Sequence, residues 1–159
     1  MADYRFVSVW NLEAPLEAVW QAIYQAEQWP QWWRGVESVV QVKPGDANGV
    51  GSLYSCVWKS ELPYRLKFNM GRTSVEPMSL ITGPAQGDLD GTGELRFSSD
   101  GRITTLRIQW NVSTTEWWMN LLAPLVRPLF AWNHRVIMGW GANGLAARLN
   151  ARLLDHQEQ

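Results

Sequence analysis

Two side chains in this sequence could move a proton in a buried site, His134 and Tyr54. His134 lies in an apolar run, and because an imidazole titrates near neutral pH it could act as a hydrogen-bond donor or general base. The phenol of Tyr54 could transfer a proton or orient a polar ligand atom. The alternative is structural: a histidine bonded to a backbone carbonyl or a sheet side chain, and a tyrosine packed in the core. The sequence leaves both interpretations open.

The cysteine and the clustered acidic residues predict neither a nucleophile nor a metal site. Cys56 is the only cysteine, so an internal disulfide and a thiolate zinc cluster are excluded, and its position between aromatic residues favours a small buried apolar side chain over a nucleophile. Asp88, Asp90 and Glu94 surround a glycine-rich stretch without the ligand pattern of a calcium loop, which predicts solvated turn acids. There are two histidines and no HxxxH spacing. We therefore expect no metal and no other cofactor.

The elements that must position these residues follow from hydrophobic periodicity. Residues 4–12 predict a strand, Pro15 opens the first of two short helices, and Gly35 caps the second. The period then changes to two, which predicts strands at 36–43, 52–62, 64–75, 78–82, 93–99 and 102–114, separated by glycine-rich turns. The last of these is the clearest, with Leu106, Ile108, Trp110 and Val112 on one face.

A helix of about 35 residues is predicted from Glu116 almost to the end, with Pro124 and Pro128 kinking or breaking its first half. The tail 154–159 is expected to fray. The pair Trp117–Trp118 at the start of the predicted C-terminal helix has three interpretations: a mobile apolar gate that touches a membrane surface, a homodimer interface, or simple packing over the sheet opening. The apolar face of its second half contains Phe130, His134, Ile137, Gly141, Leu145 and Leu149.

This order of elements predicts one α+β domain over residues 1–159. A helix that long must bury its apolar face, and a half-apolar sheet needs a cover, so we expect a curved antiparallel sheet of about seven strands wrapped around the C-terminal helix. A bent sheet and a bulky helix do not mesh completely, which predicts an apolar cavity between them. Strand parity and helix face assign ten residues to its wall: Trp10, Tyr54, Trp58, Phe68, Met70, Leu106, Trp110, Phe130, His134 and Met138.

Composition narrows the class of partner. The net charge is −1 with no basic cluster, which argues against nucleic acid. Eleven tryptophans favour either an aromatic core or a lined cavity. The apolar run from Trp117 to Val126 is about half the length that spans a bilayer, so we expect no transmembrane segment. The first ten residues do not read as a signal peptide, and with a single cysteine this predicts a cytoplasmic location.

Several segments resemble a known group. The stretch APLEAVWQAIYQAEQWPQWWRGV is similar to the start of the START-related superfamily, which includes polyketide cyclase/dehydrase-like proteins and birch-pollen-allergen relatives. The pieces LPYRLKF, GDLDGTGELRF and LLAPLVRPLFAWNHRVIMGWGANGL resemble a bacterial branch of that group without an assigned reaction. The resemblance extends from about Tyr4 to Leu154. It implies the helix-grip fold and a deep apolar pocket between the sheet and the C-terminal helix, but no particular reaction.

These observations predict a protein that binds a small hydrophobic molecule, such as a lipid, an isoprenoid, a polyketide-like or an aromatic compound. The alternative is a cyclase, dehydratase or hydrolase acting on such a molecule in the same cavity, with His134 or Tyr54 moving a proton. A third hypothesis is an interaction protein with a collapsed cavity and exposed tryptophans.

Overall fold

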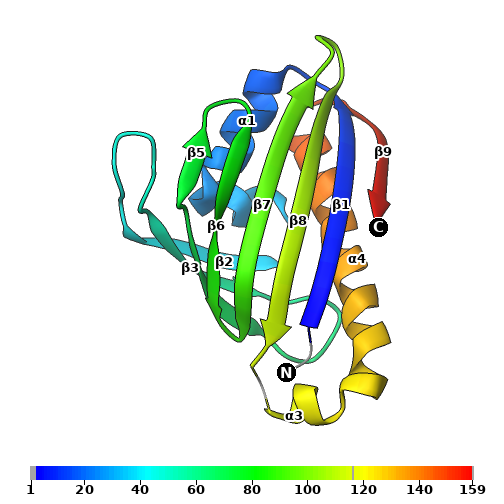
Figure 1. The fold of residues 1–159 in the computed structure, drawn as a ribbon. Helices are drawn as coiled ribbons and strands as arrows, with labels where there is room; N and C mark the ends of the chain where they lie inside the picture. Colours follow the sequence, from blue (N-terminus) through cyan, green and yellow to red (C-terminus); the bar gives the residue numbers. More distant parts are fainter. Residues whose placement is uncertain (1–2, 116, 159) are drawn as a thin grey trace.

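The computed structural model describes residues 3–115 and 117–158 as a curved antiparallel sheet with helices against its concave face (Figure 1). The strands are β1 (Asp3–Glu13), β2 (Val36–Lys43), β3 (Leu53–Trp58), β4 (Leu66–Gly71), β5 (Ser74–Glu76), β6 (Leu80–Gly87), β7 (Leu89–Ser99), β8 (Thr104–Thr114) and β9 (Arg152–Glu158). The helices are α1 (Leu16–Tyr24), the 3₁₀ turn η1 (Ala26–Gln28), α2 (Trp29–Trp32), α3 (Trp117–Leu121) and α4 (Ala123–Arg148).

The nine strands form one sheet in the order β2-β3-β4-β6-β7-β8-β1-β9, with β5 paired to β6. Neighbours along this order pair antiparallel; β1 lies beside β8, for example, with Trp10 opposite Leu106. The alternation predicted for the last sheet-forming segment is present in β8, where Leu106, Ile108 and Val112 are buried. The α+β class and the helix-covered antiparallel sheet are therefore as predicted from periodicity.

The long helix α4 is held against the sheet and against α2 by its second half. Ile137, Met138, Ala142 and Leu145 are buried on its inner face. Trp33, directly after α2, donates a hydrogen bond from Nε1 to the carbonyl oxygen of Ile137 at 2.9 Å. None of the helices in residues 3–115 and 117–158 is long and apolar enough to cross a membrane.

The chain end differs from the prediction. Of the residues 154–159 that were expected to fray, 154–158 belong to β9, which pairs antiparallel with β1, with Ser8 opposite Glu158; residue 159 lies outside the described residues. The long helix ends at Arg148, after which Asn150 adopts a positive φ of 49° and the chain reverses toward the sheet. The reason is that β1 would otherwise be an edge strand with unpaired backbone groups, and β9 satisfies them.

The glycine-rich stretch 87–93 is also more regular than predicted. It was expected to be a turn, but the turn between β6 and β7 is confined to the region of Asp88, and Gly91 and Gly93 lie inside β7. Gly91 has φ +155°, and a Cβ there would overlap the backbone carbonyl of Asn111 on β8. Glycine is therefore present because the two strands approach closely, not because the chain turns there.

Candidate functional site

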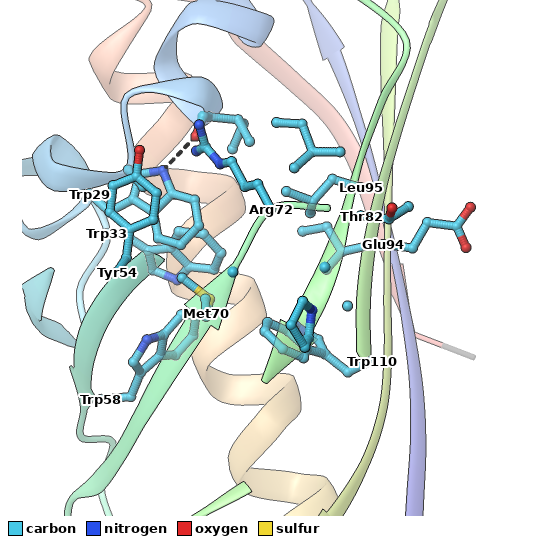
Figure 2. Close-up of a pocket in the computed structure, with 18 residues that line it drawn as sticks. Trp29, Trp33, Tyr54, Trp58, Met70, Arg72, Thr82, Glu94, Leu95 and Trp110 are labelled. Carbon is cyan, nitrogen blue, oxygen red and sulfur yellow. Dashed lines mark hydrogen bonds between the residues drawn. The ribbon is translucent and has the colours of Figure 1, made fainter. Parts of the chain in front are cut away.

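Two small apolar cavities lie between the sheet and the helices. Cavity 1, of about 60 Å³, lies under α1 and α2 and is bordered by Trp29, Trp33, Tyr54, Met70 and Arg72 among others (Figure 2). Cavity 2, of about 50 Å³, lies under α4 and is bordered by Phe6, Phe68, Phe130, His134 and Met138 among others. Each could hold a few water molecules or a small part of a ligand.

Two tryptophans separate the cavities. Trp58 from β3 and Trp110 from β8 border both of them. Phe68 lies between these rings, with its centroid 6.0 Å from that of Trp58 and 6.1 Å from that of Trp110. The resemblance implied a single deep pocket; here the bulk of three aromatic side chains fills its middle and leaves a cavity on each side.

The ten residues assigned to the wall fall into three groups. Tyr54, Met70, Trp58 and Trp110 border cavity 1, and the last two also border cavity 2. Phe68, Phe130, His134 and Met138 border cavity 2. Trp10 and Leu106 border neither cavity; both are fully buried and face each other across β1 and β8, so they belong to the solid core. Strand parity selected inward-facing residues without distinguishing cavity from core.

Arg72 is the residue of cavity 1 that sequence reasoning missed. It is buried, and its guanidinium lies 4.7 Å from the ring centre of Tyr24 and 4.9 Å from that of Tyr54. Nη2 donates to the carbonyl oxygen of Tyr24 at 2.7 Å, whereas Nη1 is buried without a hydrogen-bond partner among the described residues. No carboxylate of residues 3–115 and 117–158 pairs with it. Burial lowers the pKa of Arg72, but a guanidinium stays charged at neutral pH.

The sequence did contain a signal for Arg72. Leu66, Phe68 and Met70 alternate on one face of the predicted strand, and Arg72 continues the same parity. A charged residue at an inward-facing position is costly unless it has a partner, so it marks a candidate binding group. Figure 2 shows Arg72 extending toward Trp29, Trp33 and Tyr54, while Glu94 points away from the cavity. Trp29 and Trp33 were assigned only to a short helix and not to the wall.

The two candidate proton-transfer residues are not brought together. Tyr54 borders cavity 1, and its hydroxyl accepts a hydrogen bond from Nε2 of Gln41 at 3.3 Å. His134 borders cavity 2, where its ring stacks on Phe6 with centroids 4.1 Å apart and planes at 13°. Each would therefore have to act with other partners.

His134 is a neutral imidazole in this environment. Burial, with a smaller contribution from the charge of Arg135, lowers its pKa to about 3. Nδ1 lies 3.6 Å from Oε2 of Glu158, too far for a hydrogen bond, and neither ring nitrogen has a hydrogen-bond partner among the described residues. Burial raises the pKa of Glu158 to about 7, although its Oε2 accepts a hydrogen bond from Ser8 at 2.8 Å. The contact therefore joins a neutral imidazole to a carboxyl group that is partly protonated at neutral pH.

This carboxyl group predicts a pH-dependent stability. The pKa of Glu158 is about 7 in the folded chain and 4.5 ordinarily, so between these values the folded state holds a proton that the unfolded state has lost, and stability falls as pH rises. Glu158→Gln cannot ionise at this position. We therefore expect the free energy of unfolding of the variant, relative to that of the wild type, to increase by about 1 to 2 kcal/mol from pH 5 to pH 8. Urea unfolding at both pH values measures this difference. His134 is common to both proteins, and Glu27→Gln, at an exposed carboxylate, should show no such change; an equal difference at both pH values would contradict the assignment.

The remaining reactive residues are either buried or hydrogen-bonded to the backbone. Cys56 is fully buried, and burial raises its pKa to about 12, so it is a thiol and not a nucleophilic thiolate. Asp88 accepts a hydrogen bond from the backbone N–H of Lys67, and Asp90 accepts one from that of Gly87. Within residues 3–115 and 117–158, no group of three His, Cys, Asp or Glu side chains is placed to hold a metal ion.

The sequence matches one protein-family model. The model described as "Polyketide cyclase / dehydrase and lipid transport" covers residues 12–153, which is nearly the whole chain. No curated protein is similar enough in sequence to count as a relative.

Solved structures show the same fold at low identity. The Zhui aromatase/cyclase from Streptomyces sp. R1128 superposes with a TM-score of 0.77 at 13% identity, covering 94% of each chain. A START superfamily protein from Mycobacterium smegmatis gives 0.73 at 14% identity, covering 92% of this chain and 98% of that one. Ara h 8.0201 gives 0.61 at 11% identity, covering 92% and 99%. At these identities the likeness establishes the helix-grip fold alone.

Proposed function

We propose that this chain, which belongs to the polyketide cyclase/dehydrase and lipid transport family, binds a small apolar molecule through an oxygen that is anionic or strongly polarised. The apolar body of the ligand would occupy cavity 1, and its polar end would meet Arg72. The observation that carries this proposal is a buried guanidinium with an unused donor on the wall of an aromatic cavity.

The charge of Arg72 argues for a ligand with a polar end. Removing a cation from water costs several kcal/mol, and the two tyrosine rings and one carbonyl oxygen around it offset only part of this cost. A carboxylate or carbonyl oxygen on a ligand would use Nη1 and complete the hydrogen bonding of the guanidinium. A wholly apolar ligand would leave the donor unpaired.

The cavity dimensions argue for a small ligand or for movement of the aromatic side chains. At about 60 Å³, cavity 1 is below the usual size of a pocket for a drug-sized molecule. A longer ligand would have to displace Trp58 or Trp110 and continue into cavity 2. A surface hollow lined by Tyr24, Gln25, Ala26, Glu27, Gln28 and Tyr54 shares Ala26 and Tyr54 with cavity 1. Tyr24 and Tyr54 also contact the guanidinium of Arg72, which favours this hollow as an access route.

A matched pair of ligands tests the proposal. We expect the wild type to bind dodecanoate about ten- to a hundredfold more tightly than dodecanol, because only the acid forms a charge-assisted hydrogen bond with Arg72. Arg72→Met should abolish this preference while keeping the affinity for dodecanol. Isothermal titration or tryptophan fluorescence measures both affinities, with 2-naphthoate and 2-naphthol as a shorter aromatic pair.

The control is a basic residue of the same strand that points outward. Lys67 is exposed on β4, and Lys67→Met removes a charge without touching the cavity, so the preference for the acid should persist. Native mass spectrometry of the purified protein would identify a bound molecule directly. Failure of all four ligands to bind, or equal binding of acids and alcohols by the wild type, would contradict the proposal.

Cavity 2 supports a second candidate, an enzyme acting on the same molecules. His134 has two unpartnered ring nitrogens there, and Asn133 beside it has a buried, unpartnered Oδ1. These nitrogens can form hydrogen bonds with a substrate, but burial lowers the pKa of His134 to about 3 and makes it a weak base. A cyclase, dehydratase or hydrolase reaction would therefore need a bound substrate that raises this pKa. Recovery of the bound ligand unchanged in mass after long incubation favours binding alone. A conversion that His134→Gln abolishes, with binding retained, would favour the enzyme.

A further inference from the structure

An exposed apolar stripe follows α3 and the first half of α4. It consists of Trp117 and Leu121 in α3 and of Leu125, Leu129 and Trp132 in α4, which are spaced four or three residues apart within each helix and are all exposed. Trp117 is 73% exposed, Leu121 70% and Leu125 77%. Only the neighbours on the other side are packed: Met119 is buried, and Trp118 contacts the ring of Tyr64 at 5.6 Å. Simple packing over the sheet opening therefore does not account for the stripe.

The two helices that carry this stripe contain basic residues but no acidic ones. From Trp117 to Arg148 the sequence contains three arginines, Arg127, Arg135 and Arg148, and neither aspartate nor glutamate. Arg127 and Arg135 are exposed and follow the two halves of the stripe, and Arg127 also donates from Nη1 to the backbone carbonyl of Asp3 at 2.6 Å. The acids that adjoin these helices are Glu116, directly before α3 in the sequence, and Asp3, Asp88 and Asp90, whose carboxylates accept hydrogen bonds from Ser113, Lys67 and Gly87.

We infer that the stripe docks this protein onto the surface of an anionic lipid bilayer. A helix with leucines and tryptophans on one side and arginines beside them is suited to lie in the interface, where apolar side chains enter the acyl region and the cations meet the headgroups. Tryptophan is favoured at this depth because its ring is apolar and its N–H is polar.

The charge pattern favours a bilayer over a second copy of the chain. A two-fold dimer through the stripe would repeat the same surface on both sides and would bring arginines toward arginines with no carboxylate from Trp117–Arg148 to pair them. An anionic bilayer supplies the missing negative charge.

The stripe and cavity 2 lie on opposite sides of the same part of α4. Phe130, Asn133, His134, Ile137 and Met138 on the inner side of α4 border that cavity, and Phe130 and Asn133 directly follow Leu129 and Trp132 of the outer side in the sequence. In Figure 1, α3 and the start of α4 lie at one end of the molecule, beyond the ends of the strands. Docking would therefore place this end of the helix–sheet interface against the lipid.

Vesicle sedimentation tests the inference. Wild-type protein should bind vesicles of phosphatidylcholine with about a third phosphatidylglycerol, and binding should weaken with added salt and on phosphatidylcholine alone. Leu121→Gln/Leu125→Gln, which keeps good helix formers, should reduce the partition coefficient about tenfold or more. Arg135→Gln should reduce it about fivefold on the anionic vesicles and little on neutral ones.

The matched control removes two exposed apolar side chains elsewhere. Val40 and Val42 on β2 are 53% and 54% exposed, and Val40→Thr/Val42→Thr should leave vesicle binding unchanged. No sedimentation of the wild type with anionic vesicles, or an equal loss in both double variants, would overturn the inference. So would light scattering that shows a wild-type dimer dissociated by the leucine variant, because the stripe would then be a dimer interface. None of these outcomes depends on ligand binding at Arg72, so the two proposals can fail separately.

Discussion

Replacing Trp33 by alanine is expected to lower the free energy of unfolding by about 3 to 5 kcal/mol, the largest effect that we predict for a single substitution. Trp33 is almost fully buried, and its ring contacts those of Trp10, Trp29 and Trp58 at centroid distances of 5.3, 5.3 and 5.1 Å. It also joins α2 to α4 through its hydrogen bond to Ile137. Alanine would remove these contacts and leave a cavity continuous with cavity 1. Urea unfolding followed by circular dichroism measures the loss.

Two variants separate the contributions of Trp33. Trp33→Phe keeps an aromatic ring but loses the hydrogen bond from the indole N–H to the carbonyl of Ile137, so a loss of about 1 to 3 kcal/mol is expected. Trp117→Ala removes an equally large side chain that is 73% exposed and should change stability by no more than about 0.5 kcal/mol. If added indole restores part of the stability lost in Trp33→Ala, the vacated space is accessible to an aromatic molecule. Similar losses for the alanine variants at 33 and 117 would contradict the assignment of Trp33 to the core.

Periodicity predicted most of this fold because it reports which face of an element is buried. The alternation of Leu106, Ile108 and Val112 placed β8 correctly, and the spacing of Ile137, Gly141 and Leu145 identified the inner face of α4. Both signals are local and need no knowledge of the partner element.

The features that the sequence did not predict depend on contacts between distant residues. In β9, Leu154 and Asp155 carry no alternation of their own, and the strand forms because β1 offers an unpaired edge. Trp10 and Leu106 have the same inward parity as Trp110, but only the packing of three aromatic side chains decides which positions border a cavity. Arg72 was predictable from parity, yet its missing counter-charge became evident only once its neighbours were placed.

The site therefore combines a fixed charged group with aromatic side chains that can rotate. Arg72 is fixed by the carbonyl of Tyr24 and by two tyrosine rings. The partition between the cavities consists of aromatic side chains alone, whose rotation changes the available volume without breaking a backbone hydrogen bond. Trp58 is held by ring contacts with Trp29, Trp33 and Phe68 and by a weak interaction with the thiol of Cys56. We therefore expect Trp58 and Trp110 to determine which ligand lengths fit, and Arg72 to determine which polar end groups bind.

Gly144→Ala is expected to destabilise the protein by about 3 kcal/mol, although alanine is the better helix former. In the interior of α4, Gly→Ala should gain about 1 kcal/mol from helix propensity. A Cβ at Gly144, however, would overlap the backbone carbonyl oxygen of Trp32 at the end of α2, and backbone yields less readily than a side chain. The helix would have to move away from α2, which would loosen the packing between these two helices. Urea unfolding gives the change in stability.

Gly139 supplies the control for this prediction because it lies in the same helix. A Cβ there would meet only the ring of His156, at 3.5 Å, which is ordinary van der Waals contact. Gly139→Ala should therefore be neutral or stabilising by up to about 1 kcal/mol. The sign of the difference between two chemically identical substitutions five residues apart then reports the distance between α4 and α2. If both variants gained stability, α4 could not lie against the backbone of α2, and the placement of α4 beside α2 would be wrong.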